Sequence, residues 1–224
     1  LVMNTRSIQV AYENGVDKFV FLSSNTVYPP GDFAMKEVDA IGEFYKSYIP
    51  VGTMKYISEK MFGIYSKISR PMNILIIRPG NAYGEFDDFN FETAKVIPSL
   101  IRKVVERQNP LSVWGNGQDL KDFIYVGDLV RGIRLASQVT SPFEIFNLAA
   151  GKSVTIDEVL KMIMKLEKAS QLVIEYDSTK PSMIPIRKIA TNKAKHEFGF
   201  YPTTDLELGL EKTIKWYKSF GIWN

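Results

Sequence analysis

Two short runs, apolar almost throughout, constrain the fold of this chain most: Phe19–Leu22 and Asn73–Ile77. Both have the length of a strand, and runs of this kind are typical of strands buried on both faces of a parallel sheet. Between them, residues 51–68 place apolar side chains at helical spacing. A strand, a crossover helix and a second strand predict a doubly wound α/β fold.

The remaining periodic segments predict a mixed α/β chain of helices and short strands. Residues 33–50 have no clear period and are predicted to form a loop with one helical turn. Thr155 and Glu158 have the spacing of a capping box at the start of a helix. Further helices are expected over 5–14, 91–107, 128–137, 191–198 and 206–220, and further strands over 111–114, 123–126, 144–149 and 172–176.

Composition argues against several classes of function. The chain has 28 basic and 25 acidic residues spread along its length, with net charge +3, so we expect no nucleic-acid partner. It has no cysteine, which excludes disulfides and thiolate ligands. Its single histidine, His196, argues against a zinc site built by the protein, and we expect no metal.

No apolar run approaches the roughly 20 residues that a membrane span needs. The first residues lack a basic region followed by an apolar core. We therefore expect no membrane association and a cytoplasmic protein. Because the first residue is Leu1 rather than Met, we also expect the native protein to be longer than this chain.

Polar residues follow the first buried run directly, in the order Ser23, Ser24, Asn25 and Thr26. Open parallel sheets bind ligands just beyond the carboxyl ends of their strands. The sequence therefore predicts a binding site at this end of the sheet.

Six motifs in sequence order resemble the extended short-chain dehydrogenase/reductases that act on nucleotide sugars, in the branch of UDP-glucose 4-epimerase and GDP-L-fucose synthase. The resemblance covers nearly the whole chain. The glycine-rich loop with which that family opens, and which binds the dinucleotide pyrophosphate, is not found between Leu1 and Asn224. The motifs are Ser-Ser-Asn-Thr-Val-Tyr (23–28), Gly-x-x-Lys (52–55), Arg-Pro-Gly-Asn-Ala-Tyr-Gly (78–84), Val-Ile-Pro-Ser-Leu-Ile-Arg-Lys (96–103), Val-Trp-Gly-Asn-Gly (113–117) and Asp-Phe-Ile-Tyr-Val-Gly-Asp-Leu (122–129).

The resemblance implies a Rossmann domain that lacks its N-terminal half, followed by a smaller α/β substrate-binding domain. Residues 1–84 would belong to the first, with 122–150 partly returning to it. Residues 85–121 and 151–224 would form the nucleotide-sugar-binding domain.

The same resemblance implies a nicotinamide cofactor, NAD or NADP. Lys55 would hold the nicotinamide ribose and lower the pKa of a neighbouring tyrosine, which would then act as a general base. Ser24 would bond the reacting oxygen of the sugar. The other cofactor-binding positions implied are Leu22, Ser23, Pro79, Asn81 and Ala82.

Val51 stands where the family has its catalytic tyrosine, four residues before Lys55. Valine can neither take nor give a proton. Tyr56 and Lys60 also fit the Tyr-x-x-x-Lys pattern, but this register would lose the agreement of Gly52 and Glu59 with the family and would turn the pair to another face of the helix.

Three accounts of Val51 stay open. The protein is a binding relative that lost catalysis, or it uses another group such as Thr26, Tyr45 or Tyr48, or the residue is engineered or misassigned. Thr26 and Lys95 stand where the fucose synthase branch has a cysteine and a histidine that epimerise carbons beside the keto group, which argues against 3,5-epimerisation.

The resemblance also implies a set of contacts to a nucleotide-diphosphate sugar. Arg102 suits a diphosphate because its guanidinium can bond two oxygens at once. Lys121 stands where the family commonly has arginine. The positions implied are Ser24, Asn81, Val96, Ser99, Arg102, Trp114, Lys121 and Arg187.

The expected function is that of an NAD(P)-dependent epimerase/dehydratase that oxidises carbon 4 of the hexose transiently. The alternatives are a catalytically impaired member that binds a nucleotide sugar or a partner, and a reductase of a keto sugar. Family members often pair their lysine helix and the preceding helix with those of a second copy, so a homodimer is expected from the resemblance.

Overall fold

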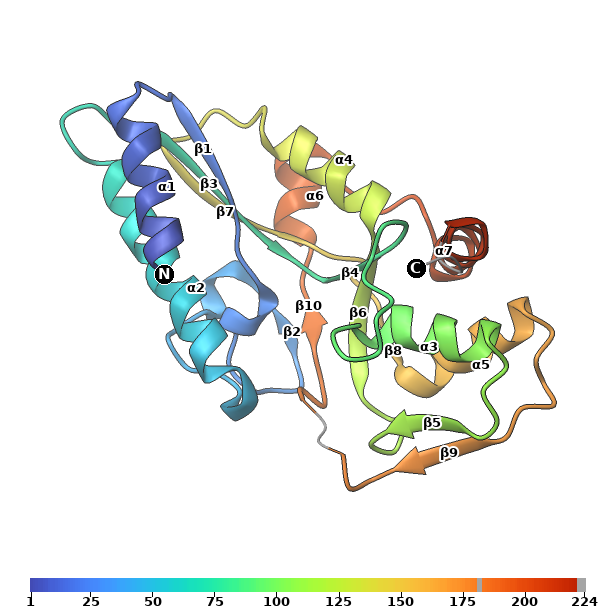
Figure 1. Ribbon diagram of the computed structural model, residues 1–224. Helices are drawn as coiled ribbons and strands as arrows, with labels where there is room; N and C mark the ends of the chain where they lie inside the picture. Colours follow the sequence, from blue (N-terminus) through green and yellow to red (C-terminus); the bar gives the residue numbers. More distant parts are fainter. Residues whose placement is uncertain (181–182, 221–224) are drawn as a thin grey trace.

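The computed structural model describes residues 1–180 and 183–220. Its central sheet is parallel, with the strand order β1 (Lys18–Leu22), β3 (Asn73–Pro79) and β7 (Phe143–Leu148). Helices α1 (Val2–Glu13) and α2 (Ile49–Tyr65) cover one face, and α4 (Val126–Ala136) and α6 (Asn192–Phe198) cover the other (Figure 1).

Successive residues of β3 supply these two faces in turn, as the period of a strand requires. Ile74 and Ile76 pack with Phe62 of α2 on one side, whereas Leu75 and Ile77 pack with Leu129 of α4 on the other. The doubly wound α/β arrangement predicted from the two apolar runs is confirmed.

A second set of elements packs around a separate apolar core. Its sheet has the order β4 (Asn81–Tyr83), β6 (Leu120–Tyr125) and β8 (Ser153–Thr155), and β5 (Leu111–Trp114) pairs in parallel with β9 (Ile174–Asp177). Three helices complete it: α3 (Val96–Val105), α5 (Ile156–Leu166) and α7 (Leu206–Phe220). The capping box at the start of α5 is confirmed, since Thr155 Oγ1 accepts from Glu158 N and Glu158 accepts from Thr155 N.

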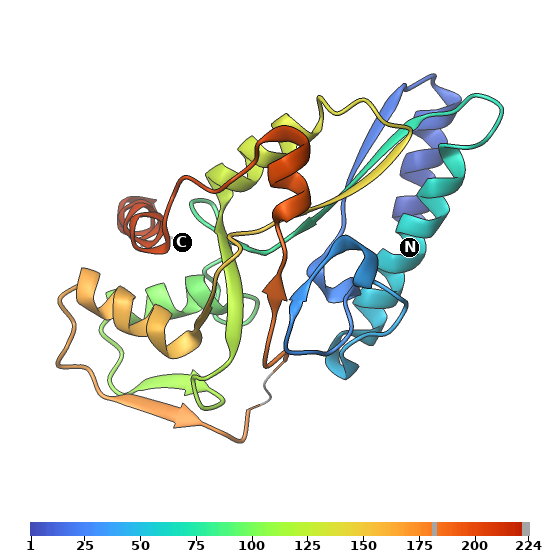
Figure 2. The ribbon, with the colours of Figure 1, turned by 180° about the vertical axis from the view of Figure 1, so that it is seen from behind.

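A short parallel pair links distant parts of the chain. Strand β2 (Ala34–Met35) pairs with β10 (Lys188–Ile189), which lies beside it in both views (Figures 1 and 2). The Asn147 side chain at the end of β7 donates to Met35 O and Ala190 O, both at 3.0 Å. The late segment that contains Arg187 is thereby held against the early part of the chain.

The short strands β4, β8 and β10 were not predicted from the sequence, and three further differences concern the elements around the site. The predicted loop 33–50 contains β2 and the 3-10 turns η2 (Glu37–Asp39) and η3 (Lys46–Tyr48). The helix expected over 91–107 begins only at Val96, because Asp88 and Asn90 accept backbone N–H groups of residues 90 and 92 and fold the preceding stretch as turns.

The third difference concerns the apolar side chains at helical spacing in α2, of which only some face the sheet: Met61 and Tyr65 pack against its core. Ile57 and Ile64 are 43% and 60% exposed. Ser58, Glu59 and Phe62 are buried instead. Glu59 can be buried because Arg78 neutralises it, with Arg78 Nη2 2.5 Å from Glu59 Oε2.

Within residues 1–180 and 183–220, no helix has both the length and the apolarity needed to cross a membrane. The boundaries expected for the two domains stay a prediction.

Candidate active site

Lys55 lies on α2 and faces the carboxyl end of β1. Its Nζ donates to Leu22 O at 2.7 Å and lies 4.6 Å from the centre of the Phe21 ring. Burial lowers the pKa of the Lys55 ammonium, although Glu59, one helical turn further on, raises it. The site therefore has a partly buried cation whose acceptor is a backbone carbonyl.

Ser24 caps the 3-10 turn η1 (Asn25–Val27), which follows β1 directly. Its Oγ accepts from Thr26 N at 3.1 Å and from Thr26 Oγ1 at 2.9 Å. Thr26 is buried, whereas Ser24 is partly exposed. The turn thus holds the Ser24 hydroxyl at the carboxyl end of the sheet, where the sequence predicted a binding site.

Gly52 brings α2 against this turn. A Cβ at residue 52 would lie 2.7 Å from Thr26 O and 2.7 Å from the Phe44 ring, so only glycine allows so close an approach. Val51 is the preceding residue and is 42% exposed. The structure thus brings Val51, Lys55 and the Ser24 turn together, with an aliphatic side chain at position 51.

A buried polar network fixes α2 to the two strand ends. Arg78 Nε and Nη2 donate to the two oxygens of Glu59, and Ser23 Oγ also donates to Glu59. Arg78 Nη1 donates to the Tyr28 hydroxyl at 3.1 Å, which donates to Asn147 Oδ1 at 2.5 Å. Ser23, expected at the cofactor, has its hydroxyl engaged in this network.

The residues after β3 form the wall beside the turn. Pro79 O accepts from Asn25 Nδ2 at 3.1 Å, and Asn81 Nδ2 donates to Asp122 O at 3.0 Å. Asn81 and Ala82 are partly exposed. Pro79 therefore contacts the Ser24 turn through Asn25, and Asn81 and Ala82 follow it on β4.

Asp122 links this wall to the segment that follows β7. Its carboxylate accepts from Ala150 N at 2.7 Å and Gly151 N at 2.8 Å. Burial raises the pKa of Asp122 to about 7, against the lowering effect of these two backbone donors. Asp122 belongs to a family motif, but its environment is that of a structural carboxylate.

Arg187 and Lys121 are neighbouring cations, the first fully buried and the second partly buried. Arg187 is 1% exposed, and its Nη1 and Nη2 donate to Pro29 O at 3.1 Å and Tyr28 O at 3.4 Å. Its Nε is buried without a hydrogen-bond partner. In the part of the chain that the structure describes, no carboxylate forms an ion pair with Arg187.

Lys121 lies close enough to Arg187 for the two positive charges to repel each other. Its Nζ lies 3.0 Å from Asp119 Oδ2 and donates to Ile184 O. Burial lowers the pKa of Lys121 despite Asp119, and the Arg187 charge lowers it further. Burial also lowers the pKa of Arg187, to about 10. Among the described residues, only Lys121 of these two cations has a carboxylate partner, Asp119, and the remaining positive charge favours an anionic ligand.

Helix α3 carries the next residues of the expected substrate contacts. Val96, partly exposed Ser99 and Lys103 share one face, because seven residues make almost two full turns. Lys103 Nζ donates to Ser112 O of β5 at 2.7 Å. Trp114, two residues further on β5, is 60% exposed.

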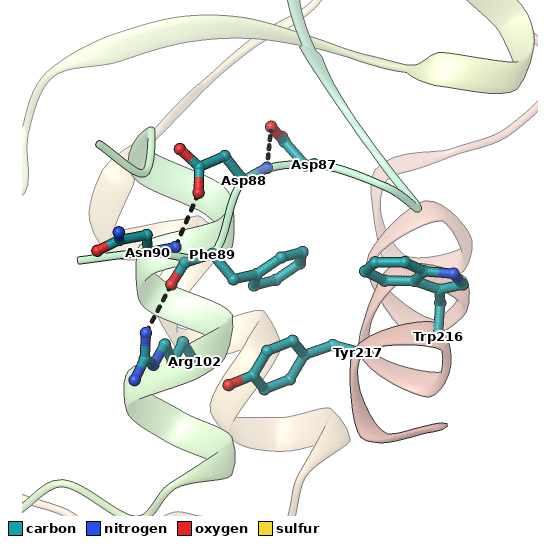
Figure 3. A pocket seen from close by; sticks show the side chains of 7 residues that line it. All are labelled: Asp87, Asp88, Phe89, Asn90, Arg102, Trp216 and Tyr217. Carbon is teal, nitrogen blue, oxygen red and sulfur yellow. Dashed lines mark hydrogen bonds between the residues drawn. The ribbon is translucent and has the colours of Figure 1, made fainter. Parts of the chain in front are cut away.

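Arg102 lies on a different face of α3. Its Nε lies 2.9 Å from Glu106 Oε1, and its Nη1 donates to Phe89 O at 2.9 Å. Arg102 lines a cavity of about 510 Å³, whose lining side chains are drawn in Figure 3. The cavity is also lined by Asp87, Asp88, Phe89, Asn90, Trp216 and Tyr217. Lys103, rather than Arg102, is the α3 cation directed toward the strand of Trp114.

Three groups were missed by sequence reasoning: Lys103, Tyr28 and Glu59 in its role as the partner of Ser23. The seven-residue spacing from Val96 to Lys103 and the four-residue spacing from Lys55 to Glu59 were the available signals. Of the groups considered as substitutes for the missing tyrosine, Tyr45 precedes η3 and Tyr48 ends it, just before α2, and both are partly buried. Burial raises the pKa of Tyr48.

Comparison with known proteins identifies related sequences and structures. Residues 1–149 match the model of a family described as the NAD dependent epimerase/dehydratase family. GDP-L-fucose synthase 1 of Arabidopsis thaliana is 30% identical over an alignment of 225 positions, which covers 97% of this chain and 68% of the relative. A dTDP-4-dehydro-6-deoxy-D-allose reductase of a Streptomyces species is 31% identical over 212 residues, 91% of this chain and 62% of the relative.

A solved structure with a similar fold is UDP-N-acetylglucosamine 4-epimerase from Methanobrevibacter ruminantium M1 in complex with UDP-N-acetylmuramic acid. It has a TM-score of 0.86 and 25% identity, and the match covers 96% of this chain and 67% of the other. The chain thus spans about two thirds of the length of these proteins.

Proposed function

Because the chain belongs to the NAD dependent epimerase/dehydratase family, we propose that it binds a nucleotide-diphosphate sugar and acts on the hexose by transient oxidation at carbon 4. The observation that carries the proposal is the Arg187 and Lys121 pair. A fully buried guanidinium with an unpaired Nε is costly unless an anion neutralises it, and a diphosphate supplies charge and several acceptor oxygens.

A nicotinamide cofactor, NAD or NADP, would supply the hydride acceptor for this chemistry. Lys55 fits its ribose, because the ammonium is partly exposed and its acceptor, Leu22 O, can be exchanged for ribose hydroxyls. Pro79, Asn81 and Ala82 would line the nicotinamide. Leu22 and Ser23 would support it from the strand end.

Ser24 would orient the reacting sugar oxygen. Its Oγ accepts two hydrogen bonds from Thr26, which leaves its own proton to donate to that oxygen. Val96, Ser99 and Lys103 on α3, with Trp114 on β5, would contact the nucleotide.

Binding of the diphosphate can be tested by calorimetric titration with UDP-, GDP- and dTDP-hexoses. We expect Arg187→Met to weaken binding about 10- to 100-fold, since a hydrogen bond to a charged group contributes about 1.5–3 kcal/mol. Arg134→Met, at an exposed arginine of α4, is the matched control and should leave the affinity unchanged. Equal affinity of the wild type and Arg187→Met would overturn the proposal.

Because Val51 cannot transfer a proton, a second candidate function is that of a family member that binds a nucleotide sugar without turning it over. Measurable binding with no product from either cofactor would support it. The similarity to a dTDP-4-dehydro-6-deoxy-D-allose reductase favours a third, a reductase of a keto sugar, which net oxidation of NADPH would distinguish.

We also propose a homodimer formed through α1 and α2. These helices pack together and leave apolar side chains exposed on both, which supports a self-complementary surface. The residues are Met3 and Val10 on α1 and Ile57 and Ile64 on α2.

A further inference from the structure

The turn that carries Ser24 has weak hydrogen bonds of its own. Val27 N donates to Ser24 O, and Tyr28 N donates to Asn25 O, both at 3.4 Å. Backbone hydrogen bonds usually measure 2.7–3.2 Å. The position of Ser24 therefore depends on contacts that reach the turn from outside.

Besides the hydrogen bond that Arg78 Nη1 donates to the Tyr28 hydroxyl, three side-chain contacts hold the turn. Asn25 Nδ2 donates to Pro79 O, and the Tyr28 hydroxyl donates to Asn147 Oδ1. The third is Arg187, whose Nη1 and Nη2 donate to the carbonyls of Pro29 and Tyr28. The first two come from residues around the central sheet, whereas Arg187 precedes β10 near the other end of the chain.

Arg187 differs from the other two contacts in its charge. It is a buried cation, its Nε has no partner, and Lys121 repels it. Without a bound anion, the cost of removing the Arg187 charge from water opposes the position of Arg187 beside the turn. An anion at Nε would neutralise the guanidinium and favour the position in which Nη1 and Nη2 bond the turn.

We propose that Arg187 is a positioning residue for Ser24. Binding of an anion at the Nε of Arg187 would make the Ser24–Pro29 turn more ordered. The inference rests on the proposed function, since the natural anion would be the diphosphate of the nucleotide sugar. Coupling of this kind is reciprocal, so an ordered turn also favours the bound anion.

The consequences reach beyond Ser24. Thr26 donates to Ser24 Oγ, and Thr26 O packs against Gly52 of α2. A firmer turn therefore fixes the Ser24 hydroxyl relative to Lys55. Phosphate recognition and the placement of the reacting groups would be one event.

Amide hydrogen exchange at Thr26 and Tyr28 tests the inference on the protein as it exists, with inorganic pyrophosphate as the probe. We expect saturating pyrophosphate to slow exchange at these two amides. Arg187→Lys keeps the charge but loses the planar fork, and should speed their exchange about five- to tenfold without ligand. Lys121→Met removes a cation that does not touch the turn but repels Arg187, so it should weaken pyrophosphate binding without speeding exchange in the free protein.

The outcomes separate this inference from the proposed function. If pyrophosphate binds and neither it nor Arg187→Lys changes exchange at the turn, the inference is wrong and the binding proposal stands. If pyrophosphate does not bind, the anion coupling fails together with the proposed function. The comparison of wild-type protein with and without pyrophosphate requires no variant, so it holds even if Arg187→Lys does not fold.

Discussion

Val51 is the residue that separates binding from chemistry in this site. The surroundings of a proton-transfer group are present, with Lys55 one helical turn further on and the Ser24 turn packed against Gly52. The side chain at position 51 is aliphatic and 42% exposed. A larger side chain there can extend toward solvent without displacing the core.

We expect Val51→Tyr to raise turnover of a nucleotide sugar by about 10²- to 10⁴-fold, the usual contribution of a positioned acid or base. The Lys55 ammonium would lower the pKa of the new phenol and so favour its role as a base. Initial rates with each cofactor measure the effect. Val51→Phe, which adds the ring without the hydroxyl, is the control. Equal rates for the two variants would mean that the proton is handled elsewhere.

At the scale of elements, the approach of α2 to η1 sets the geometry of the site. A Cβ at Gly52 would meet the Thr26 carbonyl as well as the Phe44 ring, and the backbone carbonyl cannot turn aside as a side chain can. Gly63, later in the same helix, faces the Phe143 ring, and a Cβ there would lie 3.2 Å from a side-chain atom. The two glycines therefore differ in what surrounds them.

Gly52→Ala should destabilise the protein by about 1–3 kcal/mol, because it forces α2 away from Thr26 O. Gly63→Ala should be close to neutral, because the Phe143 ring can shift and alanine favours the helix by up to about 1 kcal/mol. Urea unfolding of both variants measures the difference. A similar loss in both would indicate that the cost arises from the helix itself and not from the contact with the turn.

At the scale of the whole molecule, the exposed apolar side chains of α1 and α2 raise the question of assembly. Ile57 and Ile64 are seven residues apart and lie on one face of α2. We expect the double variant Ile57→Glu, Ile64→Glu to be monomeric where the wild type is dimeric, as measured by light scattering after size exclusion. Val130→Glu, at an exposed apolar residue of α4, should leave the dimer intact. A monomeric wild type would contradict the proposal.

The sequence predicted those features that depend on local pattern. Strands at 19–22 and 73–77 and the Thr155 capping box are confirmed, because short apolar runs and helix capping leave clear signatures. Burial on both faces is confirmed for β3 only, since Val20 and Leu22 of β1 are 36% and 48% exposed. Strands β2 and β10 have two residues each, too few for any periodicity, and their pairing joins distant segments. The network of Glu59, Arg78 and Tyr28 was missed for the same reason, since its partners meet only in the folded chain.

The pairing of β2 with β10 limits where this protein can be truncated. The family model ends at residue 149, yet β10 and Arg187 lie beyond it. A fragment cut at that point would lose the strand beside Met35 and one of the two carbonyls that Asn147 bonds. The boundary of the matched family region is therefore not a boundary at which the polypeptide can be divided.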